Sequence, residues 1–231
     1  LLQVCDPKLT FIFKQLLNVI VEGQSVREDM AEKVASNAAA LRQSLNGFFT
    51  RVLNTDEVQI TIFMGDGYRN AARKYATDSG NQCLYVDSDF PYDSRMEWFK
   101  KLINSEHPEK NIVIPANKVN NVFFMVQEME AWFLKQPECI ERWRVDNDYD
   151  RKHPEENIAE HSLIRGKDIE DIKKPSGKLA TLIKKYIFDD GKSVKYGKLS
   201  SAPGLLDNLE VSTLLPLDRE LRRFKNSFSG N

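Results

Sequence analysis

The segment Cys83–Pro91, CLYVDSDFP, carries the pattern that decides the fold. It begins with an apolar run, presents two carboxylates one residue apart, Asp87 and Asp89, and stops at a proline. A short, uninterrupted apolar run is typical of a strand that is buried on both faces, as in a parallel sheet. Acidic residues at the end of such a strand predict a site, because parallel α/β sheets place their sites beyond the carboxyl ends of the strands.

Similar apolar runs lie on both sides of this segment, and stretches rich in helix-forming residues separate them. The predicted strands are Leu16–Val21, Val58–Met64, Cys83–Asp87 and Val119–Val126. The predicted helices lie within 25–53, from Asn70 onward, at Ser94–Ile103 and at Ser176–Tyr186, with a further helical stretch at the end of the chain. The alternation predicts an α/β fold with a Rossmann-like, mainly parallel sheet flanked by helices.

The length of 231 residues suits one large domain, or a domain with a subdomain. We expect residues 1–137 to form the α/β core. Beyond residue 138 the alternation weakens into a charged, loop-rich segment. Residues 138–231 are therefore expected to form a charged linker and a partly irregular helical extension, packed on the core as part of one compact unit.

The composition indicates a soluble protein without a membrane segment, since no apolar run approaches the roughly 20 residues that a span requires. Three widely spaced cysteines, Cys5, Cys83 and Cys139, form no metal-type pair. We expect each to be a single buried thiol, which suits a reducing cytoplasm. The first residues show no export signal, so the expected location is cytoplasmic.

The net charge of −1 gives no global argument for nucleic-acid binding and leaves only local patches. Residues 138–160 contain eight acids and four bases, whereas residues 165–198 contain ten bases and five acids. Lysines of the second patch can neutralise nucleic-acid phosphates, although a charged helix face explains most of them equally well. Asp66 and Arg69 follow the second predicted strand; Arg69 faces either a phosphate or solvent.

Acidic residues gather at the ends of the predicted strands. They are Glu22, Asp66, Asp87, Asp89, Glu128 and Glu130. Residues two apart on a strand share a face, so Asp87 and Asp89 serve one site if the strand persists. Carboxylates held together need a cation or a proton to offset their repulsion, which favours a Mg²⁺ or Mn²⁺ site. The alternative is that each acid caps a following helix.

Six segments together resemble a known family. They are VEGQS, MGDGYRNAARKY, VDSDFP, FFMVQEMEAWFL, KPSGKL and YGKLSSAPGLL. The resemblance covers Val19–Leu215, most of the chain. The strand ending VEG and the later strand ending DSD resemble the TOPRIM domain of topoisomerases, primases and OLD-type nucleases. The full set is similar to a TOPRIM-like family whose bacterial members are often encoded beside an AAA or ABC-type ATPase in phage-defence operons.

The resemblance implies roles for individual residues. Glu22 takes the place of the general acid or base, Asp87 and Asp89 take the place of the metal ligands, and Glu130 is the additional carboxylate. Gly23 would let the chain turn without crowding a phosphate. Three lysines in family-like segments are the expected contacts to nucleic acid: Lys174, Lys178 and Lys198.

The activity implied is divalent-metal-dependent hydrolysis of nucleic-acid phosphodiesters by the effector subunit of an ATPase-coupled antiphage defence system. Relaxation of DNA is not expected, because no tyrosine carries a marker of the topoisomerase nucleophile. Polymerisation is not expected either, since the chain leaves little room for a template-binding apparatus. One alternative is a non-catalytic binding or regulatory subunit of the ATPase. A homo-oligomer is a further arrangement that the sequence leaves open.

A second alternative is a haloacid-dehalogenase-like phosphatase. The GDGYRN segment at 65–70 is similar to a Mg²⁺-binding loop of that superfamily, and DSD is similar to its nucleophile motif. In that superfamily, however, the DxD strand comes first, whereas here Asp66 precedes Asp87. The reversed order disfavours this interpretation.

Overall fold

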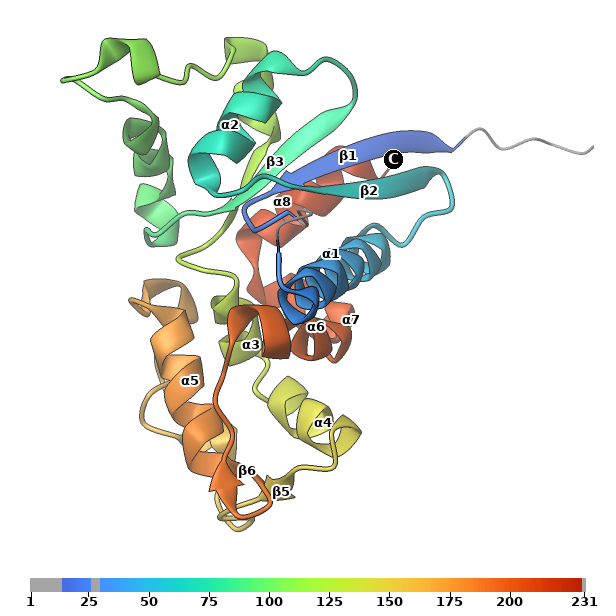
Figure 1. Cartoon of the computed structure of the whole chain (residues 1–231), viewed down its shortest axis with the longest axis vertical. Helices are drawn as coiled ribbons and strands as arrows, with labels where there is room; N and C mark the ends of the chain where they lie inside the picture. Colours follow the sequence, from blue (N-terminus) through green and yellow to red (C-terminus); the bar gives the residue numbers. More distant parts are fainter. Residues whose placement is uncertain (1–13, 26–29, 230–231) are drawn as a thin grey trace, which may run out of the picture.

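A parallel sheet of four strands forms the centre of the molecule, in the order β2-β1-β3-β4 (Figure 1). The computed structural model describes residues 14–25 and 30–229. The strands are β1 (Gln15–Val21), β2 (Val58–Met64), β3 (Gln82–Asp87) and β4 (Val122–Met125). The predicted α/β fold with a mainly parallel, Rossmann-like sheet is therefore confirmed, and β1 and β3 are its inner strands.

Both faces of the inner strands are buried because their apolar residues point alternately to opposite sides. Val19 and Val21 join a core cluster on one face of the sheet, while Ile20 joins a second cluster on the other. In β3, Tyr85 belongs to the first cluster and Leu84 to the second. This two-sided burial is the physical reason for the uninterrupted apolar runs in the sequence.

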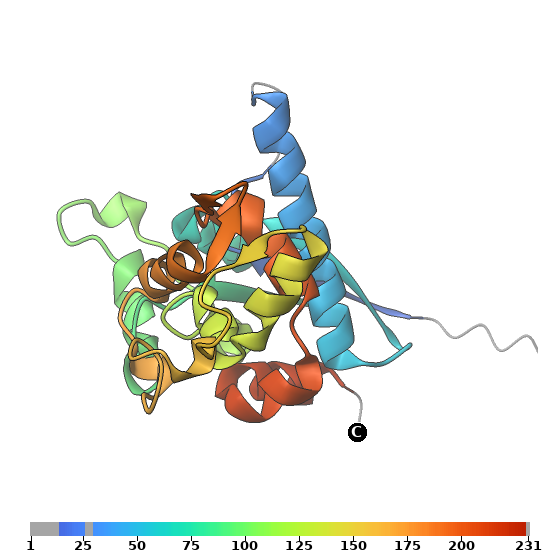
Figure 2. The same cartoon turned by 90° about the horizontal axis from the view of Figure 1, so that it is seen from below.

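Helices cover both faces of the sheet (Figure 1). On one face lie α1 (Glu32–Leu53) and α8 (Arg219–Phe228), whose apolar residues join the first cluster. On the other face lie α2 (Tyr68–Thr77) and the 3₁₀ turns of η1 (Tyr92–Leu102) and η3 (Ala116–Asn121). The first turns of α1 project beyond the rest of the described chain (Figure 2).

Two local predictions differ in detail from the structure. The helix predicted at Ser94–Ile103 is present as 3₁₀ turns, in which the carbonyl oxygens of Tyr92 and Lys101 accept hydrogen bonds from arginine side chains. These two carbonyl oxygens therefore have hydrogen-bond donors without the backbone hydrogen bonds of an α-helix. The strand predicted from Val119 begins only at Val122, because η3 occupies the residues before it.

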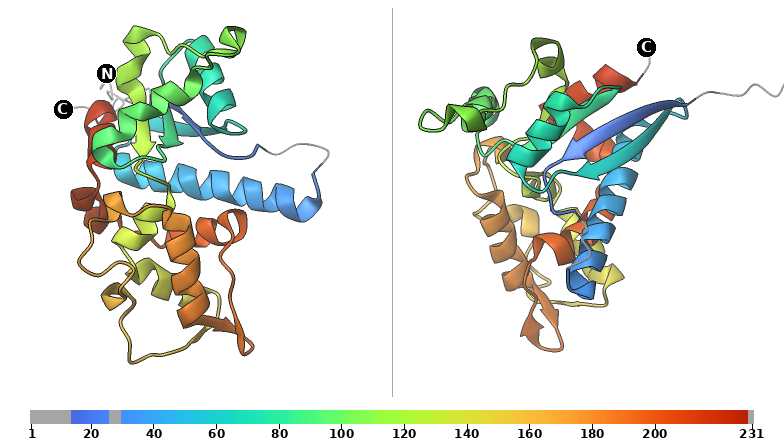
Figure 3. Two further views of the ribbon diagram at one scale, coloured as in Figure 1. Left: turned by 90° about the vertical axis from the view of Figure 1, so that its left-hand side faces the viewer. Right: turned by 45° about the horizontal axis from the view of Figure 1, so that its top comes forward.

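The C-terminal half adds short helices and a small antiparallel sheet on the far side of α1 (Figures 1 and 3). Its helices are α3 (Glu130–Lys135), α4 (Glu138–Asp146), α5 (Pro175–Tyr186), α6 (Lys198–Asp207) and α7 (Val211–Leu214). Its strands are β5 (Asp150–Arg151), β6 (Ile187–Asp189) and β7 (Lys192–Ser193). The remaining 3₁₀ turns are η2 (Pro108–Lys110), η4 (Ile158–Glu160), η5 (Ile169–Asp171) and η6 (Leu215–Leu217).

Helix α1 connects the sheet to this C-terminal half. The same hydrophobic cluster that includes Val19 continues through Phe48 of α1 to Leu205 of α6. The guanidinium group of Arg51 also donates a hydrogen bond of 2.8 Å to the Leu206 carbonyl oxygen. One continuous core thus includes residues on both sides of position 138. No helix in the described residues is long and apolar enough to cross a membrane.

Two buried acids attach α8 to the sheet and to α3. Glu220 is fully buried and accepts hydrogen bonds from Arg95 and Arg223, each at 2.7 Å. Asp218, also fully buried, accepts a 3.0 Å hydrogen bond from the Trp132 indole. It also pairs with the Lys135 ammonium at 2.8 Å. Buried charges are tolerated when they are paired and hydrogen-bonded, and both acids meet that condition.

We predict that Glu220→Ala lowers the free energy of unfolding by about 3 kcal/mol, because two guanidinium groups lose their buried partner. Chemical denaturation measures the change. Glu97→Ala is the control: Glu97 forms an exposed ion pair with Lys100 and should contribute less than about 1 kcal/mol. Equal effects of the two substitutions would contradict a structural role of the Glu220 cluster.

Candidate functional site

The carboxyl ends of β1 and β3 bring Glu22 and Asp87 to the same edge of the sheet. The strands are parallel neighbours, with Val21 opposite Tyr85. Glu22 directly follows β1, and Asp87 is the last residue of β3. The chain runs from β1 to β2 on one side and then returns to place β3 on the other side of β1. The helices α1 and α2 accordingly cover opposite faces of the sheet. In open α/β sheets, the crevice that binds a ligand forms at such a switch point.

Asp87 is 8% exposed, and both of its carboxylate oxygens have partners. Oδ1 accepts a 2.9 Å hydrogen bond from the Met129 backbone N–H, and Oδ2 lies 2.8 Å from the ammonium nitrogen of Lys198. The turn after β4 and the start of α6 therefore both bind this carboxylate.

The acidity of Glu22 is strongly perturbed. The pKa of Glu22 is raised from 4.5 to about 7, chiefly by burial and also by the charges of Asp87 and Asp89, against the opposing effects of Lys198 and Lys101. A carboxyl group with a pKa near neutrality can both accept and donate a proton at physiological pH. Such a shift in a cleft marks a candidate functional residue.

Asp89 does not share a face with Asp87, because β3 does not persist. The strand ends at Asp87, and Asp89 has a left-handed backbone conformation with φ 58°. Its side chain is 55% exposed and forms an ion pair with Lys101. The shared-face argument therefore does not apply, although the Asp89 charge still acts on Glu22.

Glu130 is the first residue of α3 and is 1% exposed. Its Oε1 accepts a 2.7 Å hydrogen bond from the Tyr196 hydroxyl, whereas its buried Oε2 has no hydrogen-bond partner in the structure. Burial raises the pKa of Glu130, the Lys198 charge lowers it, and the Asp87 charge raises it. The structure thus brings Glu22, Asp87 and Glu130 into one electrostatic neighbourhood.

Lys198 supplies the positive charge of this neighbourhood. Burial alone would lower the pKa of its ammonium group, but the carboxylates of Asp87, Glu130 and Glu22 together raise it above the ordinary value. The amine is therefore protonated at neutral pH. Of the lysines expected to contact nucleic acid, Lys198 is the one that the structure places among the predicted carboxylates.

A cleft of about 480 Å³ opens beside these groups. It is lined by Glu22, Gly23, Gln24, Leu41, Asp66, Gly67, Lys198 and Leu199. Gly23 has φ 155°, and a side chain at this position would overlap the Met64 methyl group. The glycine therefore lets the end of β1 approach Met64 at the end of β2, at the wall of the cleft. At the same wall, Asp66 accepts two hydrogen bonds from Ser25, at 2.8 Å from the backbone N–H and 2.6 Å from the hydroxyl.

The other predicted binding residues lie elsewhere. The Arg69 guanidinium donates to the carbonyl oxygens of Lys101 and Lys110, at 2.8 Å and 2.6 Å, which assigns it a structural contact. Lys174 precedes α5, and Lys178 lines a separate hollow of about 440 Å³. None of these three residues is among the groups that perturb the pKa of Glu22 or Glu130.

The carboxylate oxygens of Glu22, Asp87 and Glu130 are chemically suited to a hard divalent ion, but they are not close enough together to bind one. The buried, unpartnered Oε2 of Glu130 is an oxygen that a cation or a proton would satisfy. However, Glu22, Asp87 and Glu130 do not offer three oxygens within 4.8 Å of one another in the part of the chain that the structure describes. These side chains would have to approach one another more closely to share an ion.

Three residues in which the sequence showed no metal-ligand spacing do form such a set, namely His153, Glu155 and Glu156. The His153 imidazole lies 3.5 Å from Glu155 and 3.9 Å from Glu156. The spacing HPEE was the available signal. All three side chains are at least 40% exposed, which suits ordinary surface ion pairs.

Tyr196 was overlooked as well, although it belongs to the YGKLSS segment. Burial raises the pKa of its hydroxyl, and Glu130 raises it further. The two described cysteines, Cys83 and Cys139, are free and buried as expected, whereas Cys5 lies outside the described residues.

Comparisons with protein-family models, curated proteins and solved structures found no match.

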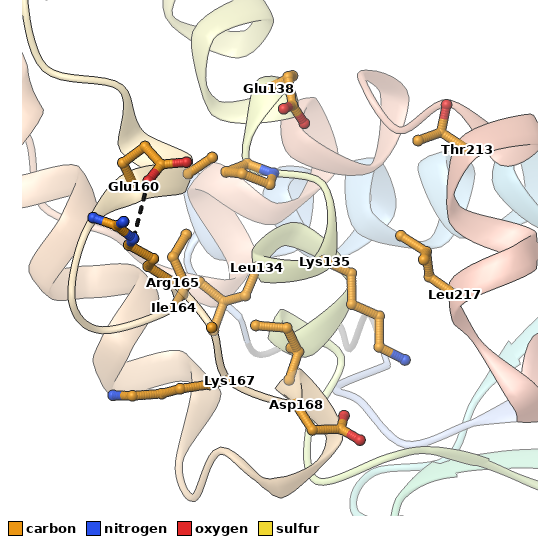
Figure 4. A pocket seen from close by; sticks show the side chains of 14 residues that line it. Leu134, Lys135, Glu138, Glu160, Ile164, Arg165, Lys167, Asp168, Thr213 and Leu217 are labelled. Carbon is orange, nitrogen blue, oxygen red and sulfur yellow. Dashed lines mark ion pairs between the residues drawn. The ribbon is translucent and has the colours of Figure 1, made fainter.

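A second hollow, of about 520 Å³, lies between α3 and the loop before α5 (Figure 4). Three of its charged lining residues, Lys135, Glu160 and Arg165, form ion pairs. The Lys135 side chain is 4% exposed and pairs with Glu170 and Asp218, and Arg165 pairs with Glu160 at 3.1 Å. None of the predicted catalytic carboxylates lines this hollow.

We predict that Glu22→Gln stabilises the metal-free protein in a pH-dependent manner. The folded chain holds the Glu22 proton up to about pH 7, while the unfolded chain releases it near 4.5. The folded state thus binds more protons in this window, so the Glu22 contribution becomes unfavourable as pH rises. Above pH 7 the variant should be more stable by on the order of 1–2 kcal/mol after solvent screening.

Urea denaturation in a chelator at pH 5 and pH 8 measures this effect. The advantage of Glu22→Gln should grow from pH 5 to pH 8, whereas Glu106→Gln, at an exposed position, should show no such trend. A difference that does not change with pH would show that Glu22 titrates as an ordinary surface carboxyl group.

Proposed function

We propose that this chain is a TOPRIM-like hydrolase that cleaves nucleic-acid phosphodiesters with the help of Mg²⁺ or Mn²⁺. The observation that carries the proposal is the position of Glu22, whose pKa is about 7, beside Asp87 at the switch point of a parallel sheet. A proton-transfer group next to buried carboxylate oxygens is the minimum that metal-assisted hydrolysis requires. The order of the VEG and DSD segments supports the same family.

Asp87 and Glu130 would hold the ion, with Glu22 beside them. A divalent ion there would neutralise charge that develops on the phosphoryl oxygens. Glu22 accepts the proton of the attacking water as the water oxygen bonds to phosphorus. The bond from phosphorus to the leaving oxygen then breaks, and that oxygen takes a proton from solvent or from Glu22. Lys198 faces the cleft and can pair with a nonbridging phosphate oxygen.

The biological setting in the proposal follows from the resemblance alone. The chain would be the cutting subunit of an antiphage defence system, and an AAA or ABC-type ATPase would be its partner and would restrain it. The cytoplasm is the corresponding location. Two lysines away from the carboxylates remain proposed contacts to nucleic acid: Lys174, which precedes α5, and Lys178, which lies in α5.

A specific observation favours the alternative of a non-catalytic subunit of the ATPase. Lysines already neutralise both aspartates of the DSD segment, since Lys198 pairs with Asp87 and Lys101 pairs with Asp89. If those ion pairs are permanent, Asp87 only holds the start of α6 on the sheet, and Asp89 only holds η1.

We predict that the purified chain, alone or with its ATPase, cuts DNA or RNA in Mg²⁺ or Mn²⁺ and is inactive in a chelator. Asp87→Asn and Glu22→Gln should each lower the cleavage rate by about 100-fold or more, because each removes a group that acts in the transition state. Asp171→Asn is the matched control at an exposed position and should retain activity. Gel assays on labelled DNA and RNA measure the rates.

Three outcomes separate the candidates. Cleavage that depends on Asp87 and Glu22 supports the nuclease. No cleavage with any metal, with ATPase binding retained in Asp87→Asn, indicates the regulatory subunit. Asp87-dependent turnover of a small phosphomonoester, without nucleic-acid cleavage, indicates a phosphatase.

A further inference from the structure

The Asp87–Lys198 ion pair joins segments 111 residues apart in the sequence. The Lys198 ammonium nitrogen lies 2.8 Å from Oδ2 of Asp87, while Oδ1 accepts the Met129 N–H. Glu130 and Glu22 also act on the same ammonium group. Among the described residues, Lys198 is thus the cation shared by these three carboxylates.

The residues just before Lys198 bind the same centre. The Tyr196 hydroxyl donates a 2.7 Å hydrogen bond to Glu130, so the segment Tyr196–Lys198 contacts two of the carboxylates at once. Lys198 is the first residue of α6, and Leu205 in that helix is fully buried. The backbone of Lys198 is therefore anchored. Its side chain is 43% exposed and carries the ammonium group on a flexible four-carbon stem.

An ammonium group and a divalent ion repel each other when both bind the same carboxylate oxygen. Mg²⁺ takes oxygen ligands at about 2.1 Å, and a second cation at hydrogen-bond distance from the same oxygen would be repelled. The other oxygen of Asp87 already accepts a backbone hydrogen bond. An ion that binds Asp87 through Oδ2 therefore competes with Lys198 for that oxygen.

We propose that Lys198 is the built-in counter-ion of the carboxylate centre and competes with the divalent ion for Asp87. This inference rests on the proposed metal-dependent function. It explains why Glu22, Asp87 and Glu130 do not offer three oxygens within 4.8 Å in the described structure. The ammonium group satisfies the centre with the carboxylates farther apart. Displaced into the cleft that it lines, Lys198 becomes available to a substrate phosphate.

Lys101 does not have the same role. Its partner Asp89 is 55% exposed, in contrast to the buried Asp87. The Lys101 ammonium group also lies 4.4 Å from the centre of the Tyr68 ring. The cation that the buried centre must exchange is therefore Lys198.

Mn²⁺ binding to the intact chain, followed by electron paramagnetic resonance and by titration calorimetry, tests this competition without any activity assay. Lys198→Met should bind Mn²⁺ about fivefold or more tightly than the wild type, because one competing ion pair is lost. Lys198→Arg keeps the cation and should stay near the wild-type affinity. Lys195→Met removes the same charge from an exposed position three residues earlier, so it reports the general charge effect.

Thermal melting confirms that each variant is folded, and Lys198→Gln replaces Lys198→Met if the latter is not. If the wild type binds Mn²⁺ and Lys198→Met binds no more tightly than Lys195→Met, the competition is refuted while the metal-dependent function stands. If neither the wild type nor the Lys198 variants bind Mn²⁺, the metal centre itself is refuted, and the proposed function falls with it. Asp87→Asn should abolish the binding in every background.

Discussion

The parallel pairing of β1 with β3 is the constraint on which the site depends. Both strands are buried on both faces, so their ends emerge from the core side by side, and each ends at an acid. Helix α1 leaves β1 along one face and α2 precedes β3 along the other, which opens the edge of the sheet at that point. The shift of the Glu22 pKa to about 7 is the electrostatic consequence, since burial and the nearby Asp87 both disfavour its charge.

Sequence patterns were sufficient for the sheet because two-sided burial leaves a strong signal. Each strand was placed to within a few residues, and the acids Glu22 and Asp87 were placed at its carboxyl edge from strand ends alone. The strands β5, β6 and β7 were missed because strands of two or three residues carry no periodicity. Asp89 was misplaced because a single left-handed residue redirects its side chain, and an aspartate at such a position leaves no distinctive pattern.

The partners contributed by the C-terminal half were beyond the reach of sequence patterns for a different reason. Lys198 and Tyr196 reach Asp87 and Glu130 only because α6 packs against α1 and α1 packs against the sheet. Long-range placement of this kind depends on how helices dock, which local periodicity does not encode. The motif YGKLSS drew attention to Lys198 through the family resemblance, but it gave no indication that the lysine would neutralise an aspartate of the DSD segment.

The contacts that stabilise the metal-free fold are the same ones that occupy the carboxylate oxygens of the proposed metal site. Buried carboxylates such as Asp87 and Glu130 are unfavourable unless a cation, a proton or a hydrogen bond offsets their desolvation. Lys198 and Tyr196 meet most of that requirement, which stabilises the fold but occupies the oxygens that a divalent ion would need. The unpartnered oxygen of Glu130 is the part of the centre left unsatisfied. If a divalent ion competes with Lys198 as proposed, metal affinity and the stability of the metal-free fold change in opposite directions when Lys198 is altered.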